Sequence, residues 1–302
     1  MQNFADLLAA AVSRCQNPVL VGIDPRVESL PPALAPADPA DPAQVAAAYG
    51  RFARDVIDVV APLVPAIKPQ AAFFEELGPA GMTVLADVVR YGQQHGLIVI
   101  VDGKRNDIGS TATAYAQGFL GRTSPWGADA LTVSPYLGDD SLQPFVDVAQ
   151  ARGAGLFVLV KTSNPGGRML QDLVVSDGRP MYRHVAEYVE GLAQKTQGLC
   201  GYGSVGAVVG ATYPEQLVEL RAAMPHTWFL VPGYGSQGGT AKDVAAAFNA
   251  QGLGAIVNNS RGIIFAYRAK PYAERFGAPR WQAAVEAATR DMIEQLRAAR
   301  RA

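Results

Sequence analysis

The sequence is poor in cysteine and histidine and has no long apolar run. Its 302 residues include two cysteines, Cys15 and Cys200. They are too few and too far apart to indicate a disulfide framework or a thiolate metal site. The three histidines are scattered, and no cluster of histidine and carboxylate residues has the spacing of metal ligands, so we predict no metal ion. No run of 18 apolar residues exists, so we expect no membrane-spanning helix.

An excess of charge of either sign is also missing. The chain has 26 basic and 27 acidic residues, a net charge of −1, and this balance gives no indication of nucleic-acid binding. The first 15 residues contain Asp6 and no basic cluster ahead of their apolar positions. This pattern is typical of an amphipathic helix rather than a secretion signal. We therefore expect a soluble cytoplasmic protein.

Eight short apolar runs are present, and a helical segment follows each of them. Alternating strands and helices in this number predict a closed parallel (β/α)₈ barrel, a TIM barrel. We expect one domain over residues 1–302, with an additional helix at each end of the chain. An open doubly wound sheet is the alternative, but no G-x-G-x-x-G motif follows the first run. The runs lie at 17–25, 63–69, 97–104, 130–136, 155–166, 204–212, 227–239 and 253–262, with the last two helices ending near 250 and 299.

Polar residues collect at the carboxyl ends of these runs. The carboxyl ends of the strands form the active face of a (β/α)₈ barrel, so we expect these side chains to converge. They are Asp24, Lys68, Asp102, Lys104, Ser163, Gln237 and Arg261.

The segment VDGKRNDIGST, residues 101–111, concentrates most of the charge. Asp102 and Lys104 are two apart at the carboxyl end of the strand expected at 97–104, so their side chains should share a face. Asp107 follows in a turn before a helix that Ser110 or Thr111 could cap. Alternating charges at the mouth of a sheet can hold a charged substrate and move a proton. An aspartate–lysine pair that only closes off a strand is the alternative.

Two glycine-rich segments, PGYGSQGG at 232–239 and NNSRG at 258–262, follow the seventh and eighth runs. The loops in these positions are the usual phosphate site of a barrel, where backbone amides and a helix N-terminus hold an anion. Arg261 would add charge-assisted hydrogen bonds. Ordinary turn glycines are the alternative for either loop alone.

Together these motifs resemble the orotidine 5′-phosphate decarboxylase family, in its longer bacterial (type 2) branch. The resemblance rests on the Asp-x-Lys-x-x-Asp pattern of DGKRNDIGST, joined to PGYGSQGG and the late Arg261, and it extends from Gly22 to Arg261. Asn106 departs from the small residue common in this branch. The resemblance implies decarboxylation of orotidine 5′-phosphate to uridine 5′-phosphate without a cofactor.

The resemblance also implies a role for each matching residue. Lys104 would stabilise and protonate the carbanion, Asp102 would sit against the substrate carboxylate, and Lys68 would neutralise Asp102 and touch the ribose. In a homodimer, Asp107 and Ile108 would complete the site of the partner subunit. The other implied substrate-binding residues are Asp24 for the ribose, Ser163 for the pyrimidine, Gln237 and Arg261 for the phosphate, and Thr111, Pro232 and Gly238.

Three rival functions remain open on the sequence. A related barrel lyase would decarboxylate a sugar phosphate with a metal ion, and would need a further carboxylate near Asp102. An aldolase could form a Schiff base on Lys161 or Lys68. A barrel could also bind a nucleotide without turning it over.

Overall fold

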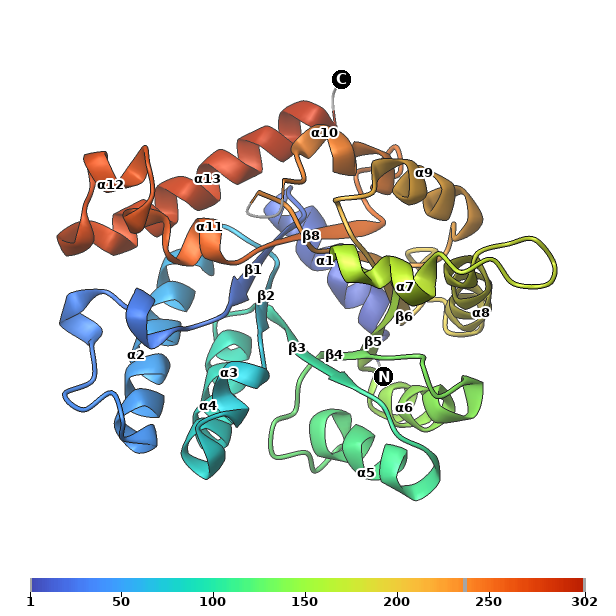
Figure 1. Cartoon of the computed structure of the whole chain (residues 1–302), viewed down its shortest axis with the longest axis horizontal. Helices are drawn as coiled ribbons and strands as arrows, with labels where there is room; N and C mark the ends of the chain where they lie inside the picture. The colour runs from blue at the N-terminus through green and yellow to red at the C-terminus, as the bar shows by residue number, and fades with distance from the viewer. Residues whose placement is uncertain (1, 236–237, 301–302) are drawn as a thin grey trace.

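The computed structural model describes residues 2–235 and 238–300 and contains a closed barrel of eight parallel strands in sequential order. The predicted (β/α)₈ fold is therefore confirmed, and in Figure 1 helices surround the strands. Each strand is short and almost wholly buried. The strands are β1 (Val19–Ile23), β2 (Ala66–Pro69), β3 (Ile98–Arg105), β4 (Ala130–Val133), β5 (Gly155–Lys161), β6 (Val205–Val209), β7 (Phe229–Val231) and β8 (Ala255–Asn259).

Helices connect the strands and pack on the outside of the barrel, and short helical turns extend several connections. The longer helices are α1 (Phe4–Cys15), α2 (Pro42–Val60), α4 (Gly78–Gln94), α5 (Gly109–Leu120), α6 (Asp139–Arg152), α8 (Met181–Lys195), α9 (Pro214–Ala223) and α13 (Trp281–Ala299). The short ones are α3 (Ala72–Glu75), α7 (Arg168–Gln171), α10 (Ala241–Val244), α11 (Arg261–Ile264) and α12 (Tyr272–Arg275). Among the described residues, no helix has the length and apolar character needed to cross a membrane.

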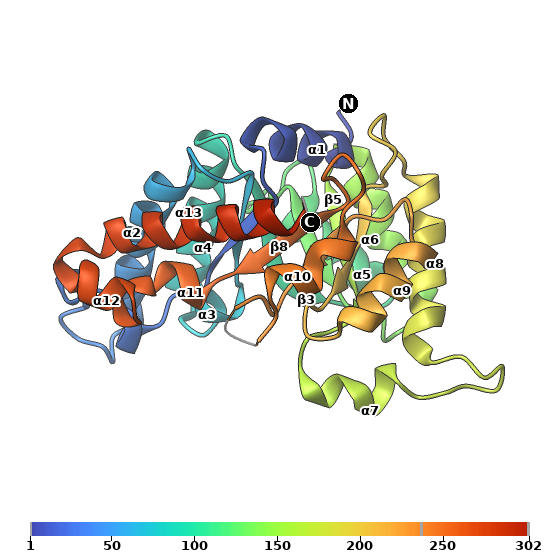
Figure 2. The same cartoon turned by 90° about the horizontal axis from the view of Figure 1, so that it is seen from above.

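Alternating strand residues divide the core into two apolar clusters. Leu20 belongs to the cluster inside the barrel, whereas its neighbours Val19 and Val21 belong to the cluster between sheet and helices. Helix α1 covers the amino end of the barrel, where Phe4 meets the ring of Phe157 edge-on, with ring centroids 6.0 Å apart. Figure 2 shows α1 and α7 at opposite ends of the molecule. The amino end is thus filled by side chains, and the carboxyl end is left for the site.

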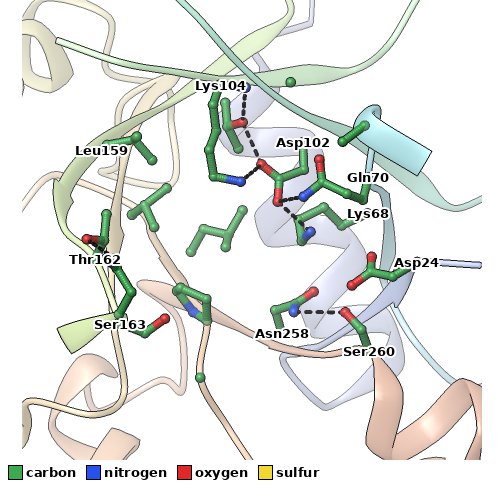
Figure 3. A pocket seen from close by; sticks show the side chains of 18 of the residues that line it. Asp24, Lys68, Gln70, Asp102, Lys104, Leu159, Thr162, Ser163, Asn258 and Ser260 are labelled. Carbon is green, nitrogen blue, oxygen red and sulfur yellow. Dashed lines mark hydrogen bonds and ion pairs between the residues drawn. The ribbon is translucent and has the colours of Figure 1, made fainter. Parts of the chain in front are cut away.

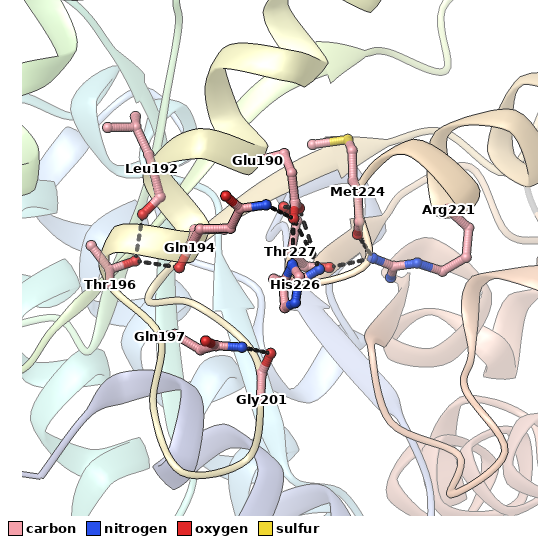
Figure 4. A network of polar contacts seen from close by, with 11 residues as sticks. Glu190, Leu192, Gln194, Thr196, Gln197, Gly201, Arg221, Met224, His226 and Thr227 are labelled. Carbon is pink, nitrogen blue, oxygen red and sulfur yellow. Dashed lines mark hydrogen bonds and ion pairs between the residues drawn. The ribbon is translucent and has the colours of Figure 1, made fainter.

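A buried polar network reinforces the amino end of β7. Glu190 of α8 accepts hydrogen bonds from Thr227 Oγ1 at 2.7 Å and pairs with His226 Nδ1 at 2.6 Å. Arg221 of α9 donates to the carbonyl of Thr227 at 2.9 Å. Figure 4 shows these groups around the buried Glu190 carboxylate. Because every group is paired, the network ties α8 and α9 to the start of β7 without an orphaned charge.

Strand β3 contains Asp102 and Lys104 at its carboxyl end, as predicted, and extends one residue further to Arg105. Two other local predictions were wrong. Helix α5 already begins at Gly109, and no side chain caps it, so neither Ser110 nor Thr111 is a cap. The helix expected to run to residue 250 is one turn of α10, which opens with a capping box at Thr240, followed by a 3₁₀ turn that ends at Ala247.

Candidate active site

The carboxyl ends of the strands surround a cavity of about 910 Å³. Its floor is apolar, formed by Leu159, Val208 and Leu230, and its walls carry the polar side chains. Among the residues predicted from sequence, Asp24, Lys68, Asp102, Lys104, Ser163, Pro232 and Arg261 line it. These side chains therefore converge on one cavity, as predicted.

The Asp102 carboxylate is the centre of the polar wall, and four donors reach its two oxygens. Lys68 Nζ and Gln70 Nε2 donate to Oδ2 at 2.7 and 2.9 Å. Lys104 Nζ and Thr132 Oγ1 donate to Oδ1 at 2.7 and 2.8 Å. A carboxylate offers about four acceptor positions, so this one is saturated and its orientation is fixed. Figure 3 shows Lys68, Gln70 and Lys104 converging on it from three sides.

Burial and charge act in opposite directions on this cluster. Burial would raise the pKa of Asp102, but the ammonium groups of Lys68 and Lys104 outweigh it and hold the pKa well below its ordinary value. Burial would likewise lower the pKa of Lys68, but the carboxylates of Asp102 and Asp24 outweigh it and raise that pKa. Both shifts favour the charged forms of Asp102 and Lys68 at neutral pH.

Lys104 differs from Lys68 in exposure and in backbone conformation. Its side chain is 48% exposed, whereas that of Lys68 is 5% exposed. The backbone φ of Lys104 is +45°, in the left-handed region that side-chain-bearing residues rarely adopt. The pairing of β3 with β4 also slips between Val101 and Arg105. Such irregularities commonly re-aim a side chain next to an active site, and here the Lys104 ammonium faces the open cavity.

The ribose and ring positions implied by the resemblance lie on the opposite walls. Asp24 Oδ1 is buried and has no hydrogen-bond partner among the described residues, so it can accept a bond from a ligand. Ser163 follows β5, and Arg261 opens α11 after β8. The one-turn α10 offers less helix dipole to a phosphate than the sequence predicted.

Other predicted residues are not placed at the cavity. Gln237 lies outside the described residues. Gly238 is described, with a left-handed φ of +96°, but is not part of the lining. Asp107, Ile108 and Thr111 lie on the β3–α5 connection and the first turn of α5, and none of them lines the described cavity of its own chain. Asp107 Oδ1 accepts the backbone N–H of Ile108 at 2.8 Å.

Several polar lining residues were missed from sequence. Gln70 and Thr132 contact Asp102, and Asn258 donates to Ser260 Oγ at 3.3 Å on the opposite wall. The position of Gln70 directly after the second apolar run was an available signal. Thr132 lies inside an apolar run, where a threonine is more often ordinary β-structure.

Two rival functions would need a metal site or a reactive Lys161 amine. No group of three or more histidine, cysteine, aspartate or glutamate residues that could hold a metal occurs within 2–235 and 238–300. The side chain of Lys161 is 1% exposed, forms an ion pair with Asp172, and lies 4.6 Å from the ring centre of Tyr213. Lys161 does not line the described cavity, so a carbonyl substrate there would not reach its amine.

Comparisons with known proteins identify the family of the chain. A family model described as Orotidine 5'-phosphate decarboxylase / HUMPS family matches residues 18–276. The chain is 58% identical over 302 residues to an orotidine 5'-phosphate decarboxylase of Rhodopirellula baltica, covering 98% of this chain and all of the relative. It is 38% identical over 279 residues to that of Caldicellulosiruptor bescii, covering 89% of this chain and 91% of the relative.

A solved structure extends the likeness to three dimensions. The OMP decarboxylase of Leishmania donovani superposes with a TM-score of 0.77 at 36% identity, and the match covers 100% of both chains. With a family model over most of the chain and relatives of this identity and coverage, the chain belongs to the orotidine 5'-phosphate decarboxylase family.

Proposed function

We infer that this protein decarboxylates orotidine 5′-phosphate to uridine 5′-phosphate, a step of pyrimidine nucleotide synthesis. The observation that carries the inference is the Lys68–Asp102–Lys104 cluster, held at 2.7 Å contacts on the wall of the cavity. Breaking the bond between ring carbon 6 and the carboxylate releases CO₂ and leaves the electron pair on carbon 6. The site must stabilise this charge and supply one proton.

Lys104 is the group suited to both tasks. Its side chain is half exposed, and the contact of its ammonium with Asp102 Oδ1 fixes the direction from which it faces a ligand. A preorganised cation next to developing negative charge stabilises the transition state. The same ammonium then donates a proton to carbon 6 as a general acid, and regains one from solvent. No cofactor takes part in this proposal.

The remaining lining residues divide the substrate between them. Asp102 would lie against the substrate carboxylate, and Lys68 would neutralise Asp102 and contact the ribose. The unpartnered Asp24 Oδ1 can accept a ribose hydroxyl, and Ser163 can bond the pyrimidine ring. Arg261, with the segment around Gln237 and Gly238 and with Pro232, would bind the phosphate by charge-assisted hydrogen bonds.

The direct test mixes purified protein with orotidine 5′-phosphate in the presence of a chelator and follows CO₂ release together with the absorbance change. We expect stoichiometric conversion to uridine 5′-phosphate. Turnover that disappears on exhaustive chelation and returns with Mg²⁺ would favour the metal-dependent sugar-phosphate lyase instead. Binding of the nucleotide without any turnover would identify a binding protein.

We also propose that two copies join across their barrel mouths, with residues 1–302 of each folding as one domain. The β3–α5 connection, helix α5 and the segment after β4 carry exposed large apolar side chains, namely Ile108 at 57%, Tyr115 at 39%, Tyr136 at 72% and Leu137 at 43%. Exposed apolar groups clustered at one end favour a protein interface. Asp107, Ile108 and Thr111 would then reach the partner's cavity rather than their own.

Subunit mixing tests this arrangement. Lys104→Ala and Asp107→Ala proteins, each inactive alone, are combined under conditions in which subunit exchange is demonstrated. A heterodimer has one site with both lesions and one with neither, so about half of its sites should recover if Asp107 acts in trans. No recovery despite exchange would place Asp107 in its own barrel.

A cytoplasmic location fits this substrate, because a phosphorylated nucleotide does not cross an apolar bilayer unaided.

A further inference from the structure

Thr132 of β4 occupies an unusual position between the two groups assigned to the chemistry. Its side chain is buried, and its hydroxyl makes two hydrogen bonds. Oγ1 donates to Asp102 Oδ1 at 2.8 Å and accepts the backbone N–H of Lys104 at 2.9 Å. A threonine hydroxyl has one donor and two acceptor positions, so its only proton is committed to Asp102.

The strand pairing explains why a side chain is needed at this point. Val101 pairs with Leu131 and Arg105 pairs with Val133, so the segment from Asp102 to Lys104 faces Thr132 alone. An irregularity of this kind leaves backbone groups of the longer strand without ladder partners. The Lys104 N–H is one such group, and the Thr132 hydroxyl accepts its hydrogen bond in place of a carbonyl.

The same contact supports the unusual backbone of Lys104. A left-handed φ is unfavourable for a residue with a side chain, and it persists only where the surroundings fix it. The bond from Lys104 N–H to Thr132 holds this conformation, and the bond from Thr132 to Asp102 fixes the carboxylate to which the Lys104 ammonium is paired. One hydroxyl therefore helps to fix both the backbone conformation of Lys104 and the position of its ammonium group.

We propose that Thr132 is a positioning residue that sets the geometry of Lys104 for proton transfer, without touching the reacting atoms itself. This inference rests on the proposed decarboxylation for its kinetic consequences. Loss of the hydroxyl should leave the binding of substrate and product almost unchanged, because the phosphate and ribose contacts lie on other walls of the cavity. It should instead lower kcat, because a displaced ammonium loses most in the transition state.

The test compares Thr132→Val, which keeps the shape and removes the hydroxyl, with Thr132→Ser, which keeps the hydroxyl. Thr289→Val is the matched control, because Thr289 of α13 is also fully buried and donates to a carbonyl, that of Val285 at 2.7 Å, and does not line the cavity. We expect Thr132→Val to lower kcat by roughly ten- to a hundredfold. KM and the Kd for uridine 5′-phosphate should stay close to wild type.

Serine should recover most of kcat, and Thr289→Val should keep wild-type kcat. A Thr132→Val enzyme with wild-type kcat would overturn the proposal, as would a serine variant as impaired as the valine variant, or a loss expressed in KM alone. If Thr132→Val does not fold, Thr132→Cys replaces it, because a thiol is a weak donor.

A readout without substrate separates this inference from the proposed function. Hydrogen exchange of the Lys104 backbone amide should be slow in wild type and Thr132→Ser, and faster in Thr132→Val, because its acceptor is removed. Wild-type protein that does not turn over orotidine 5′-phosphate would refute the proposed function, and the exchange measurement would still decide the role of Thr132. An unchanged exchange rate of the Lys104 amide in Thr132→Val would refute the proposed role of Thr132.

Discussion

Strands β3 and β5 each carry a lysine paired with an aspartate at their carboxyl end, Lys104 next to the last residue of β3 and Lys161 as the last residue of β5. The two pairs lie in opposite surroundings. On β3, the Lys104 side chain is 48% exposed and faces the cavity, while its partner Asp102 is buried and has three further donors. On β5, Lys161 is the buried member at 1% exposed, and its partner Asp172 is 35% exposed at the end of α7. In the first pair the anion is fixed and the cation is available. In the second the cation is enclosed and the anion reaches solvent.

The difference in exposure gives the two lysines different roles, chemical for Lys104 and structural for Lys161. The Lys161 ammonium is enclosed by Asp172 and by the rings of Tyr213 and Tyr182, whose centres lie 4.6 and 5.4 Å away. Gln171, next to Asp172, accepts the backbone N–H of Thr162 at 3.0 Å. These contacts fasten the α7 segment, part of which lines the cavity, to the end of β5. Lys161 therefore stabilises a wall of the site, whereas Lys104 faces what the site contains.

The largest difference between the two lysines should appear in turnover. Lys104→Ala should lower kcat on the order of 10⁴-fold, because it removes both the general acid and the stabilising charge. Binding of uridine 5′-phosphate should remain measurable, since Arg261 and Asp24 are intact. Lys161→Met, the matched loss of an ammonium at a strand end, should retain most of kcat. Equal losses in the two variants would contradict the comparison.

The two members of the Lys161–Asp172 pair should differ in how much their substitution destabilises the fold. Asp172→Asn leaves the enclosed Lys161 ammonium without its counterion and should destabilise the fold by about 3–5 kcal/mol. Lys161→Met leaves Asp172 partly in water, so it should cost clearly less. Urea unfolding of both variants measures the difference. If Lys161→Met proved the more destabilising, the enclosed cation would not be the member that needs its partner.

A smaller effect should appear in the pH dependence of the free energy of unfolding, through the Asp102 carboxylate of β3. The pKa of Asp102 is held below its ordinary value of 3.8. A lowered native pKa adds stability above the unfolded pKa, and this contribution is lost as the pH falls through the native value. Lys104→Ala removes one of the two cations that lower the pKa, so it should reduce that contribution at pH 6. The stability gap to wild type should narrow as the pH falls through the native pKa of Asp102 in the variant. A constant gap in urea unfolding would show that Lys104 does not affect the Asp102 charge.

The sequence predicted the barrel and seven residues of the cavity lining because both follow from local patterns. Alternating runs identify strands, and polar residues at their ends, such as Asp24, Lys68 and Asp102, necessarily meet at one face of a closed barrel. Lys161 fitted the same pattern equally well. Its enclosure depends on Asp172 and Tyr213, which come from other connections, so no pattern around residue 161 could distinguish it from Lys104.

What could not be predicted depends on contacts between neighbouring strands. The left-handed backbone of Lys104 arises from the slipped pairing of β3 with β4, and a residue's φ is not visible in its sequence. Gln70 and Thr132 become important only because β2 and β4 flank β3. The roles of Asp107, Ile108 and Thr111 depend on a second chain, so they stay predictions.

The most direct test of the central claim is chemical restoration of the ammonium at position 104. Lys104→Cys should be almost inactive in CO₂ release from orotidine 5′-phosphate. Alkylation with 2-bromoethylamine converts the cysteine into a close analogue of lysine with an ammonium at nearly the same distance. Wild-type protein treated in parallel controls for modification of Cys15 and Cys200, which are both free. Recovery of a large part of the lost kcat is the predicted result. A fully alkylated protein that stays inactive would contradict the assignment of the reaction to the Lys104 ammonium.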